Sequence, residues 1–124
     1  MKVLVVDDEQ LVRWFLERAL TKGNHEVITA SNIFEASEKL ASGDIDLILL
    51  DFRMPEGNGT ELIKKMDNSA NGPRIIVCSA FVTAEIETEL KSNGICILRK
   101  PFKLDELNNA LKDCMEKEPV RSYQ

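Results

Sequence analysis

The stretch Val3-Leu4-Val5-Val6-Asp7-Asp8 decides the fold class, because an unbroken apolar run ends directly in two carboxylates. Strands that are buried on both faces of a parallel sheet need such continuous apolar side chains. Further short apolar runs follow at residues 27–28, 45–50, 75–78 and 95–98. The sequence therefore predicts five strands.

Segments with helical spacing separate these runs. The first stops at Gly23, a residue type that favours a helix end, and has one apolar face made of Val12, Phe15, Leu16, Ala19 and Leu20. The second follows Asn32, with Glu35 as its capping-box partner, and extends to about residue 40. Three more are expected at about residues 59–66, 83–90 and 104–114. This alternation predicts an α/β fold: a doubly wound five-stranded parallel sheet with five helices distributed over both faces.

The composition argues against several classes of protein. With 124 residues, 44% of them hydrophobic, the chain fits one domain. The 16 Lys and Arg residues against 21 Asp and Glu residues give a net charge of −5, which argues against direct binding of nucleic acid. No apolar run approaches the roughly 18 residues of a membrane span. Three distant cysteines without a C-x-x-C spacing fit neither a zinc site nor a disulfide framework. We expect a cytoplasmic domain without membrane contact.

The predicted strands end in residues that carry chemistry. Asp7 and Asp8 follow the first strand, Asp51 the third and Ser79 the fourth, and Lys100 lies at the end of the fifth. Parallel strands present their carboxyl ends at one edge of the sheet, where sites of this fold class lie. Taken singly, each is commonly a turn residue or a helix cap, and Asp8 is a candidate cap for the first helix. Together they predict a site at this edge.

Three crowded carboxylates repel one another unless a cation neutralises them. Ligands that offer only oxygen select a hard cation, and an open site favours Mg²⁺. A carboxylate screened by a metal is a competent nucleophile toward a phosphoryl group, and Asp51, central in the trio, is the best candidate. Lys100 supplies positive charge for the transferring group, while the Ser79 hydroxyl and the Ala80 backbone N–H supply hydrogen-bond donors.

Four segments of the chain resemble the receiver domain of the two-component response-regulator family. They are Val3-Leu4-Val5-Val6-Asp7-Asp8-Glu9, Asp51-Phe52-Arg53-Met54-Pro55, Ser79-Ala80 and Lys100-Pro101-Phe102. The resemblance covers residues 1–117 as one receiver domain and leaves residues 118–124 as a polar tail or a truncated linker. It implies a flavodoxin-like strand order, 2-1-3-4-5. It also implies a phosphorelay protein that catalyses its own phosphorylation and slow dephosphorylation, rather than an enzyme that turns over an external metabolite.

For individual residues, the resemblance implies that Asp51 accepts a phosphoryl group from the phosphohistidine of a sensor histidine kinase or phosphotransfer protein. Asp8 and Asp51 would bind Mg²⁺ directly, and Asp7 directly or through water. The backbone carbonyl of Arg53 would complete the metal site.

The resemblance also implies a switch. Ser79 and Lys100 would contact the phosphoryl oxygens and transmit the change, and the Lys100–Pro101 peptide bond would be cis. Ile97 stands where the family usually has Tyr or Phe as part of this switch, and Asn58 stands where an Asp often precedes the glycine. Because a β-branched side chain is stiff at χ1, we expect a smaller rearrangement at residues 80–84, or simple packing of Ile97 against the fourth helix.

A docking surface on the first helix is a further implication. Receivers typically offer this helix to the kinase, and Leu11 and Trp14 lie outside its apolar face. They are therefore candidate docking contacts, although a single exposed Trp is also common without a partner. A homodimer that forms on phosphorylation is a further possible partner arrangement.

Three alternative functions stay open. A flavin-binding module has the same fold, but it needs a Ser/Thr/Gly-rich phosphate loop where this chain has Asp7-Asp8-Glu9. A metal-dependent hydrolase could use the three carboxylates, but no second general base is evident. The third alternative is a degenerate receiver that serves only as a protein-binding scaffold. Ile97 keeps this alternative open, because it replaces the Tyr or Phe that the family usually has in its switch.

Overall fold

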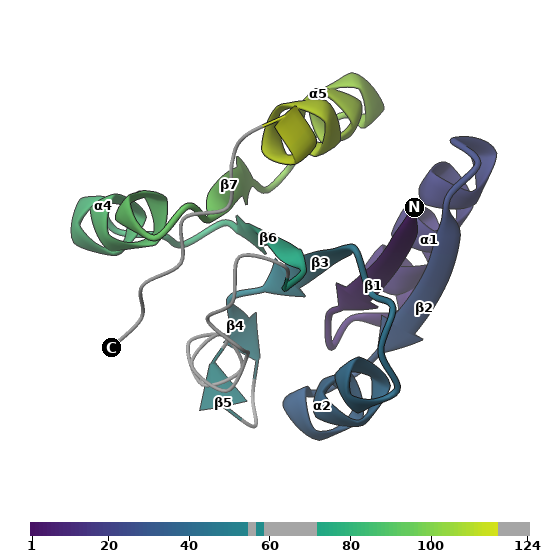
Figure 1. Ribbon diagram of the computed structural model, residues 1–124. Coiled ribbons are helices and arrows are strands. Elements are labelled where there is room, and N and C mark those ends of the chain that lie inside the picture. The colour runs from purple at the N-terminus through teal and green to yellow at the C-terminus, as the bar shows by residue number, and fades with distance from the viewer. Residues whose placement is uncertain (55–56, 59–71, 117–124) are drawn as a thin grey trace.

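A computed structural model describes residues 1–54, 57–58 and 72–116 of the chain. Its central feature is a parallel sheet of five strands in the order β2-β1-β3-β6-β7 (Figure 1). The strands are β1 (Lys2–Val6), β2 (Glu26–Ala30), β3 (Leu47–Asp51), β6 (Arg74–Ser79) and β7 (Cys96–Arg99). Numbered along the chain, these five strands have the order 2-1-3-4-5 that the family resemblance implies.

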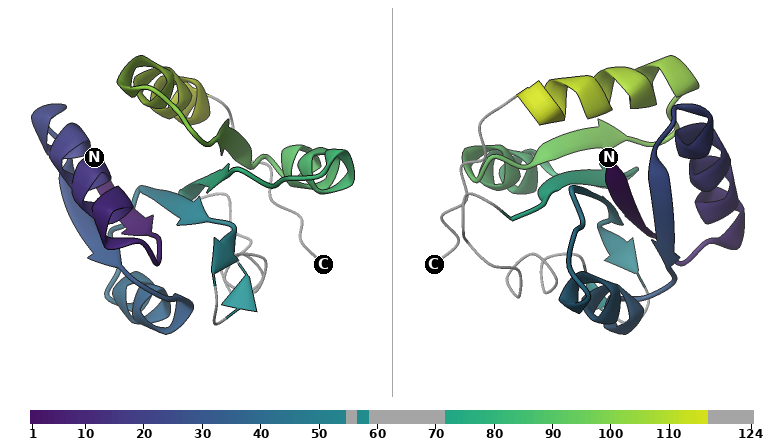
Figure 2. Two further views of the ribbon diagram at one scale, coloured as in Figure 1. Left: turned by 180° about the vertical axis from the view of Figure 1, so that it is seen from behind. Right: turned by 45° about the vertical axis from the view of Figure 1, so that its right-hand side comes forward.

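Helices cover both faces of the sheet (Figure 2), two on each face within the part of the chain that is described. They are α1 (Gln10–Lys22), α2 (Ile33–Ala41), α4 (Ala84–Ser92) and α5 (Leu104–Glu116). Helices α1 and α5 pack on one face, and α2 and α4 pack on the other. The helix expected at residues 59–66 and the expected tail at residues 118–124 lie outside the described residues. None of the described helices is both long and apolar enough to cross a membrane.

The central strand β3 explains why continuous apolar runs mark this sheet. All of its residues are buried, and successive side chains enter opposite cores: Leu47 and Leu49 face α1 and α5, whereas Ile48 and Leu50 face α2 and α4. A strand with polar residues at alternate positions would place them in one of these cores.

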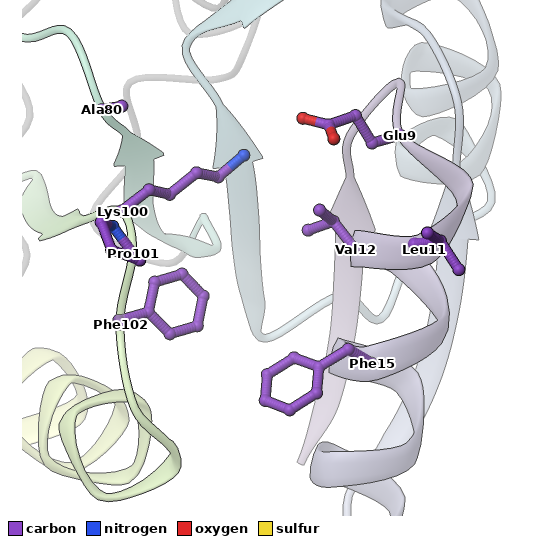
Figure 3. A pocket seen from close by; sticks show the side chains of 8 residues that line it. All are labelled: Glu9, Leu11, Val12, Phe15, Ala80, Lys100, Pro101 and Phe102. Atoms are coloured by element: carbon purple, nitrogen blue, oxygen red, sulfur yellow. The ribbon is translucent and has the colours of Figure 1, made fainter.

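The apolar face of α1 is narrower than the sequence predicts. Leu16 and Leu20 are buried, but Phe15, which was expected to fill the same face, is 43% exposed. Phe15 lies at the edge of the stripe and faces the loop that follows β7 rather than the sheet (Figure 3). The expectation was wrong for this residue because helical spacing does not reveal where the neighbouring layer ends.

Local signals set the helix starts. The Asn32 side chain accepts a hydrogen bond of 2.8 Å from the Glu35 backbone N–H at the start of α2, and Thr83 caps α4 in the same way. At α1 the cap position is Glu9, whose side chain makes no capping hydrogen bond. Asp8 therefore does not cap this helix, because it precedes the cap position.

A short antiparallel hairpin follows β3 and was not predicted. It consists of β4 (Arg53–Met54) and β5 (Gly57–Asn58), with Arg53 paired to Asn58. Strands of two residues are too short to produce a periodic pattern in the sequence. Arg53, the first residue of this hairpin, follows Asp51 by two residues and so lies near the carboxyl end of β3.

Candidate functional site

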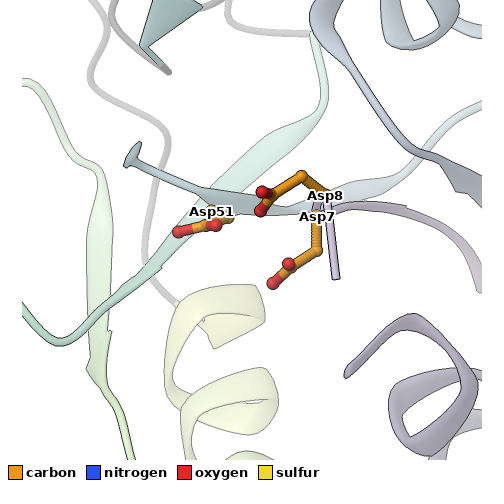
Figure 4. A group of neighbouring side chains, drawn as sticks. All are labelled: Asp7, Asp8 and Asp51. Carbon is orange, nitrogen blue, oxygen red and sulfur yellow. The ribbon is translucent and has the colours of Figure 1, made fainter. Parts of the chain in front are cut away.

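The carboxyl edge of the sheet brings three carboxylates together. Asp7 and Asp8 follow β1, and Asp51 ends β3, so these residues come from adjacent strands. One ligand atom from each lies within 4.8 Å of the others (Figure 4). Asp7 and Asp51 are buried, with 2% and 7% exposure, whereas Asp8 is exposed to solvent. The cluster is therefore a half-enclosed site that opens on the side of Asp8.

Hydrogen bonds hold Asp7 at every polar atom. One carboxylate oxygen accepts from the Glu9 backbone N–H at 2.9 Å, and the other accepts from Lys100 Nζ at 2.9 Å. Its own backbone N–H donates to the Ala30 carbonyl at 3.1 Å, and its carbonyl accepts from the Arg13 guanidinium at 2.7 Å. Sequence reasoning missed Arg13, because on a helix it looks like one more solvated basic residue.

Lys100 carries positive charge into the cluster. Its Nζ lies 2.9 Å from a carboxylate oxygen of Asp7 and 3.8 Å from one of Asp51. Burial works against the charged ammonium, but the hydrogen bond to Asp7 and the charges of Asp51 and Asp7 outweigh it and raise the pKa of Lys100. The ammonium therefore stays protonated. The Lys100–Pro101 peptide bond is cis, the isomer that the resemblance implies.

Ser79 lies at the end of β6 and is 3% exposed. Register places Asp51 beside Cys78, so Ser79 lies one residue beyond the strand partner of Asp51. The Ser79 hydroxyl accepts a hydrogen bond of 3.1 Å from the Phe81 backbone N–H, and its carbonyl accepts from the Lys100 backbone N–H at 3.1 Å. These bonds turn the chain sharply after β6 and leave Ala80 exposed at the site.

The neighbouring thiol of Cys78 is not a competing nucleophile. Burial, together with the nearby carboxylates, raises the pKa of Cys78 to about 12 against the opposing effect of Lys100. The thiolate is the reactive form of cysteine, so this side chain behaves as a small buried apolar group.

Ile97 lies on β7 with its side chain in the core between the sheet and α4. It is partly buried and packs against the core cluster on this face, to which α4 contributes Leu90. This position agrees with packing on the α4 side of the sheet, and the smaller rearrangement at residues 80–84 stays a prediction.

The surface next to the site is apolar. A cavity of about 490 Å³ lies between α1 and the loop after β7 (Figure 3). Its lining combines site residues with apolar side chains of both segments: Glu9, Leu11, Val12, Phe15, Ala80, Lys100, Pro101 and Phe102. Leu11 is 79% exposed at this rim, and Trp14 is 56% exposed beside it, with Arg18 stacked on its ring at 4.7 Å. Phe15 and Phe102 were not predicted as part of this surface.

The donor set fits a hard divalent cation. The cluster offers carboxylate oxygens, and within the described residues the ammonium of Lys100 leaves the three carboxylates with excess negative charge. Oxygen ligands with this charge suit Mg²⁺. A bound phosphate ester, by contrast, would be repelled by the same carboxylates without a cation.

Comparison with known proteins agrees with this geometry. A family model described as the response regulator receiver domain matches residues 3–112. The chain is 30% identical to the sporulation initiation phosphotransferase F of Bacillus subtilis, over 90% of this chain and 90% of that protein. It is 34% identical to a chemotaxis protein CheY homolog of Campylobacter jejuni, over 93% of this chain and 92% of the relative.

A solved structure shares both the fold and part of the sequence. The response regulator protein TrrA of Thermotoga maritima, in complex with Mg²⁺ and BeF, has a TM-score of 0.75 at 33% identity, over 91% of this chain and 97% of that one. The family match covers most of the chain, and the matched segment includes the three carboxylates, Ser79 and Lys100. The chain belongs to the response regulator receiver domain family.

Proposed function

We propose that Asp51 accepts a phosphoryl group from the phosphohistidine of a sensor histidine kinase or a phosphotransfer protein, in a reaction that depends on Mg²⁺. The observation that carries the proposal is the convergence of Asp7, Asp8 and Asp51 within 4.8 Å, with the Lys100 ammonium beside them. Membership of the receiver-domain family indicates a role in two-component signalling. The geometry of the cluster supports Asp51 as the residue that accepts the phosphoryl group.

In the proposed transfer, a carboxylate oxygen of Asp51 attacks the phosphorus atom. An O–P bond forms, the P–N bond of the phosphohistidine breaks, and its electron pair returns to the imidazole nitrogen. Lys100 stabilises negative charge on the phosphoryl oxygens, and Ser79 and the Ala80 backbone N–H donate hydrogen bonds to them. Asp51 is the proposed acceptor because it is a buried carboxylate at the end of the central strand β3, with the Lys100 ammonium 3.8 Å away, whereas both carboxylate oxygens of Asp7 already accept hydrogen bonds.

The residues that would hold Mg²⁺ are Asp8 and Asp51, with Asp7 either direct or through water and the backbone carbonyl of Arg53. When bound, the ion supplies the positive charge that lets a carboxylate approach a phosphoryl group. The hydrogen bonds at both oxygens of Asp7 support a more distant role for this residue than for the exposed Asp8.

Phosphorylation would be transmitted through the segment from β6 to β7. Ser79 and Lys100 are joined by a backbone hydrogen bond, so movement at one strand end reaches the other. Ile97 has no ring to rotate, which supports a small rearrangement of residues 80–84. Its packing on the face of the sheet that α4 covers supports the alternative, in which the output surface lies elsewhere. Residues 1–117 would form the whole receiver domain, acting in the cytoplasm and, once phosphorylated, able to form a homodimer.

Treatment with acetyl phosphate tests the proposal directly. We expect intact-mass measurement of the wild-type chain to show a gain of one phosphoryl group with Mg²⁺ and none with EDTA, because uncompensated carboxylates repel the donor. Beryllofluoride with Mg²⁺ should also bind and stabilise the fold by mass action. A chain that gains no phosphoryl group and binds no beryllofluoride would instead be a degenerate receiver that acts as a scaffold.

We expect Trp14→Ala to slow phosphotransfer from the kinase about fivefold to tenfold, because a large exposed ring at a protein interface often carries much of its binding energy. Labelling by acetyl phosphate should not change, since Trp14 lies outside the cluster of carboxylates. Phe34→Ala is the matched control, because Phe34 is a 72% exposed aromatic residue on α2. An unchanged kinase rate in Trp14→Ala would remove Trp14 from the docking surface.

A further inference from the structure

The Asp7–Asp8 peptide unit is the backbone element on which the acidic site depends. Strand β1 ends at Val6, so the carbonyl of Asp7 lies beyond the sheet and needs a partner from elsewhere. Arg13 donates to it from its guanidinium at 2.7 Å, a short distance typical of charge-assisted bonds. Because a peptide unit is planar, holding this carbonyl also sets the direction in which the chain enters Asp8.

The backbone of Arg13 also takes part in the first turn of α1. Its N–H donates to the Glu9 carbonyl at 3.1 Å, while the Glu9 N–H donates to the Asp7 carboxylate at 2.9 Å. The turn of residues 7–9 is thereby closed between the end of β1 and the first turn of α1. Arg13 thus contacts Asp7 through its side chain and Glu9 through its backbone N–H, and these two residues are the ends of the turn.

A carboxylate on α2 interacts electrostatically with Arg13. Glu35 on α2 accepts hydrogen bonds from Ser31 and Asn32 in the loop after β2. The pKa of Glu35 is lowered by the Ser31 hydroxyl and also, in part, by the positive charge of Arg13. The charges of Glu35 and Arg13 therefore attract each other.

We propose that Arg13 is a positioning residue that holds the Asp7–Asp8 turn in the orientation required for divalent-cation binding, an inference that rests on the proposed function of the same site. Among the described residues, Arg13 reaches the cluster through the Asp7 carbonyl and not through a carboxylate oxygen. Its positive charge alone would weaken cation binding, because like charges repel. If Arg13 acts by positioning, its replacement lowers the affinity for the cation. If it acts only through its charge, its replacement raises that affinity.

Titration calorimetry with MgCl₂ on the full chain separates the two effects. We expect Arg13→Gln to raise the Mg²⁺ dissociation constant about tenfold, as is typical for loss of a group that orients a metal ligand. Arg13→Lys should restore part of the affinity, because an ammonium can still donate to the carbonyl. Arg18→Gln is the matched control: it removes the same charge from the same helix, but Arg18 stacks on Trp14 instead. Unchanged or tighter binding in Arg13→Gln would overturn the proposal.

Amide hydrogen exchange in the metal-free protein gives an independent measurement. In Arg13→Gln we expect the Glu9 amide, which donates to Asp7, to exchange faster, while the amides of β3 keep their wild-type rates. Equal Glu9 exchange in the variant and the wild type would contradict the proposal. If the wild type itself bound no Mg²⁺, the proposed function would be wrong, and the exchange rates would still decide whether Arg13 holds the turn.

Discussion

Replacing Asp51 by Asn should abolish the gain of one phosphoryl group that acetyl phosphate and Mg²⁺ produce on the wild-type chain. The amide has nearly the shape of the carboxylate but lacks the negatively charged oxygen that attacks phosphorus. Since Asp51 is 7% exposed at the end of β3, the variant also removes charge from a crowded, buried position. We therefore expect the folded state of the metal-free variant to be at least as stable as that of the wild type.

Asp113→Asn serves as the control for this change. Asp113 is an exposed residue on α5, so its replacement removes one charge without altering the site. Intact-mass measurement should show full phosphorylation of this control. A persistent gain of one phosphoryl group in Asp51→Asn, equal to that of the wild type, would show that another residue is the acceptor.

Replacing Lys100 by Gln should slow phosphorylation by acetyl phosphate about 100-fold, the size of effect found when one preorganised donor to a developing charge is removed. The ammonium lies 2.9 Å from Asp7 and 3.8 Å from Asp51, where it can reach a phosphoryl group on the latter. Mg²⁺ affinity should not fall in this variant, because the carboxylates lose a competing cation. This combination separates a role toward the phosphoryl group from a role in binding the metal.

Lys103→Gln is the matched control for the loss of charge, because Lys103 is an exposed residue in the same loop. Lys100→Arg tests geometry at constant charge, since a planar guanidinium does not replace a compact ammonium at a close contact. The time course of intact mass measures all three variants. A Lys100→Gln variant that is phosphorylated at the wild-type rate would exclude Lys100 from the transfer.

Several features of the site could be predicted from sequence because each depends on a local pattern and one general rule. Asp7, Asp8 and Asp51 follow apolar runs directly, and the carboxyl ends of parallel strands meet at one edge. Their approach to within 4.8 Å follows from the placement of β1 beside β3. The helix starts at Asn32 and Thr83 could also be predicted from local sequence, because a capping side chain bonds to the backbone of its own helix.

Other features leave no trace in the periodic pattern of the sequence. Phe15 has the helical spacing of a core residue, yet it is 43% exposed because the layer beneath α1 ends before it. Arg13 resembles any polar residue of an amphipathic helix until the end of β1 places a free carbonyl beside it. The hairpin after β3 is too short to leave a periodic signal in the sequence.

The sequence by itself thus determined the fold class, the strand ends and the three carboxylates, because burial on both faces of a sheet requires apolar runs that stop abruptly. Only the tertiary structure decided which groups hold those carboxylates in place. The Asp7 carboxylate is bound by Lys100, 93 residues away along the chain, and the backbone carbonyl of Asp7 is bound by Arg13 of α1, the helix that follows β1. Contacts of this kind depend on the three-dimensional approach of side chains, which the period of a strand or a helix does not encode.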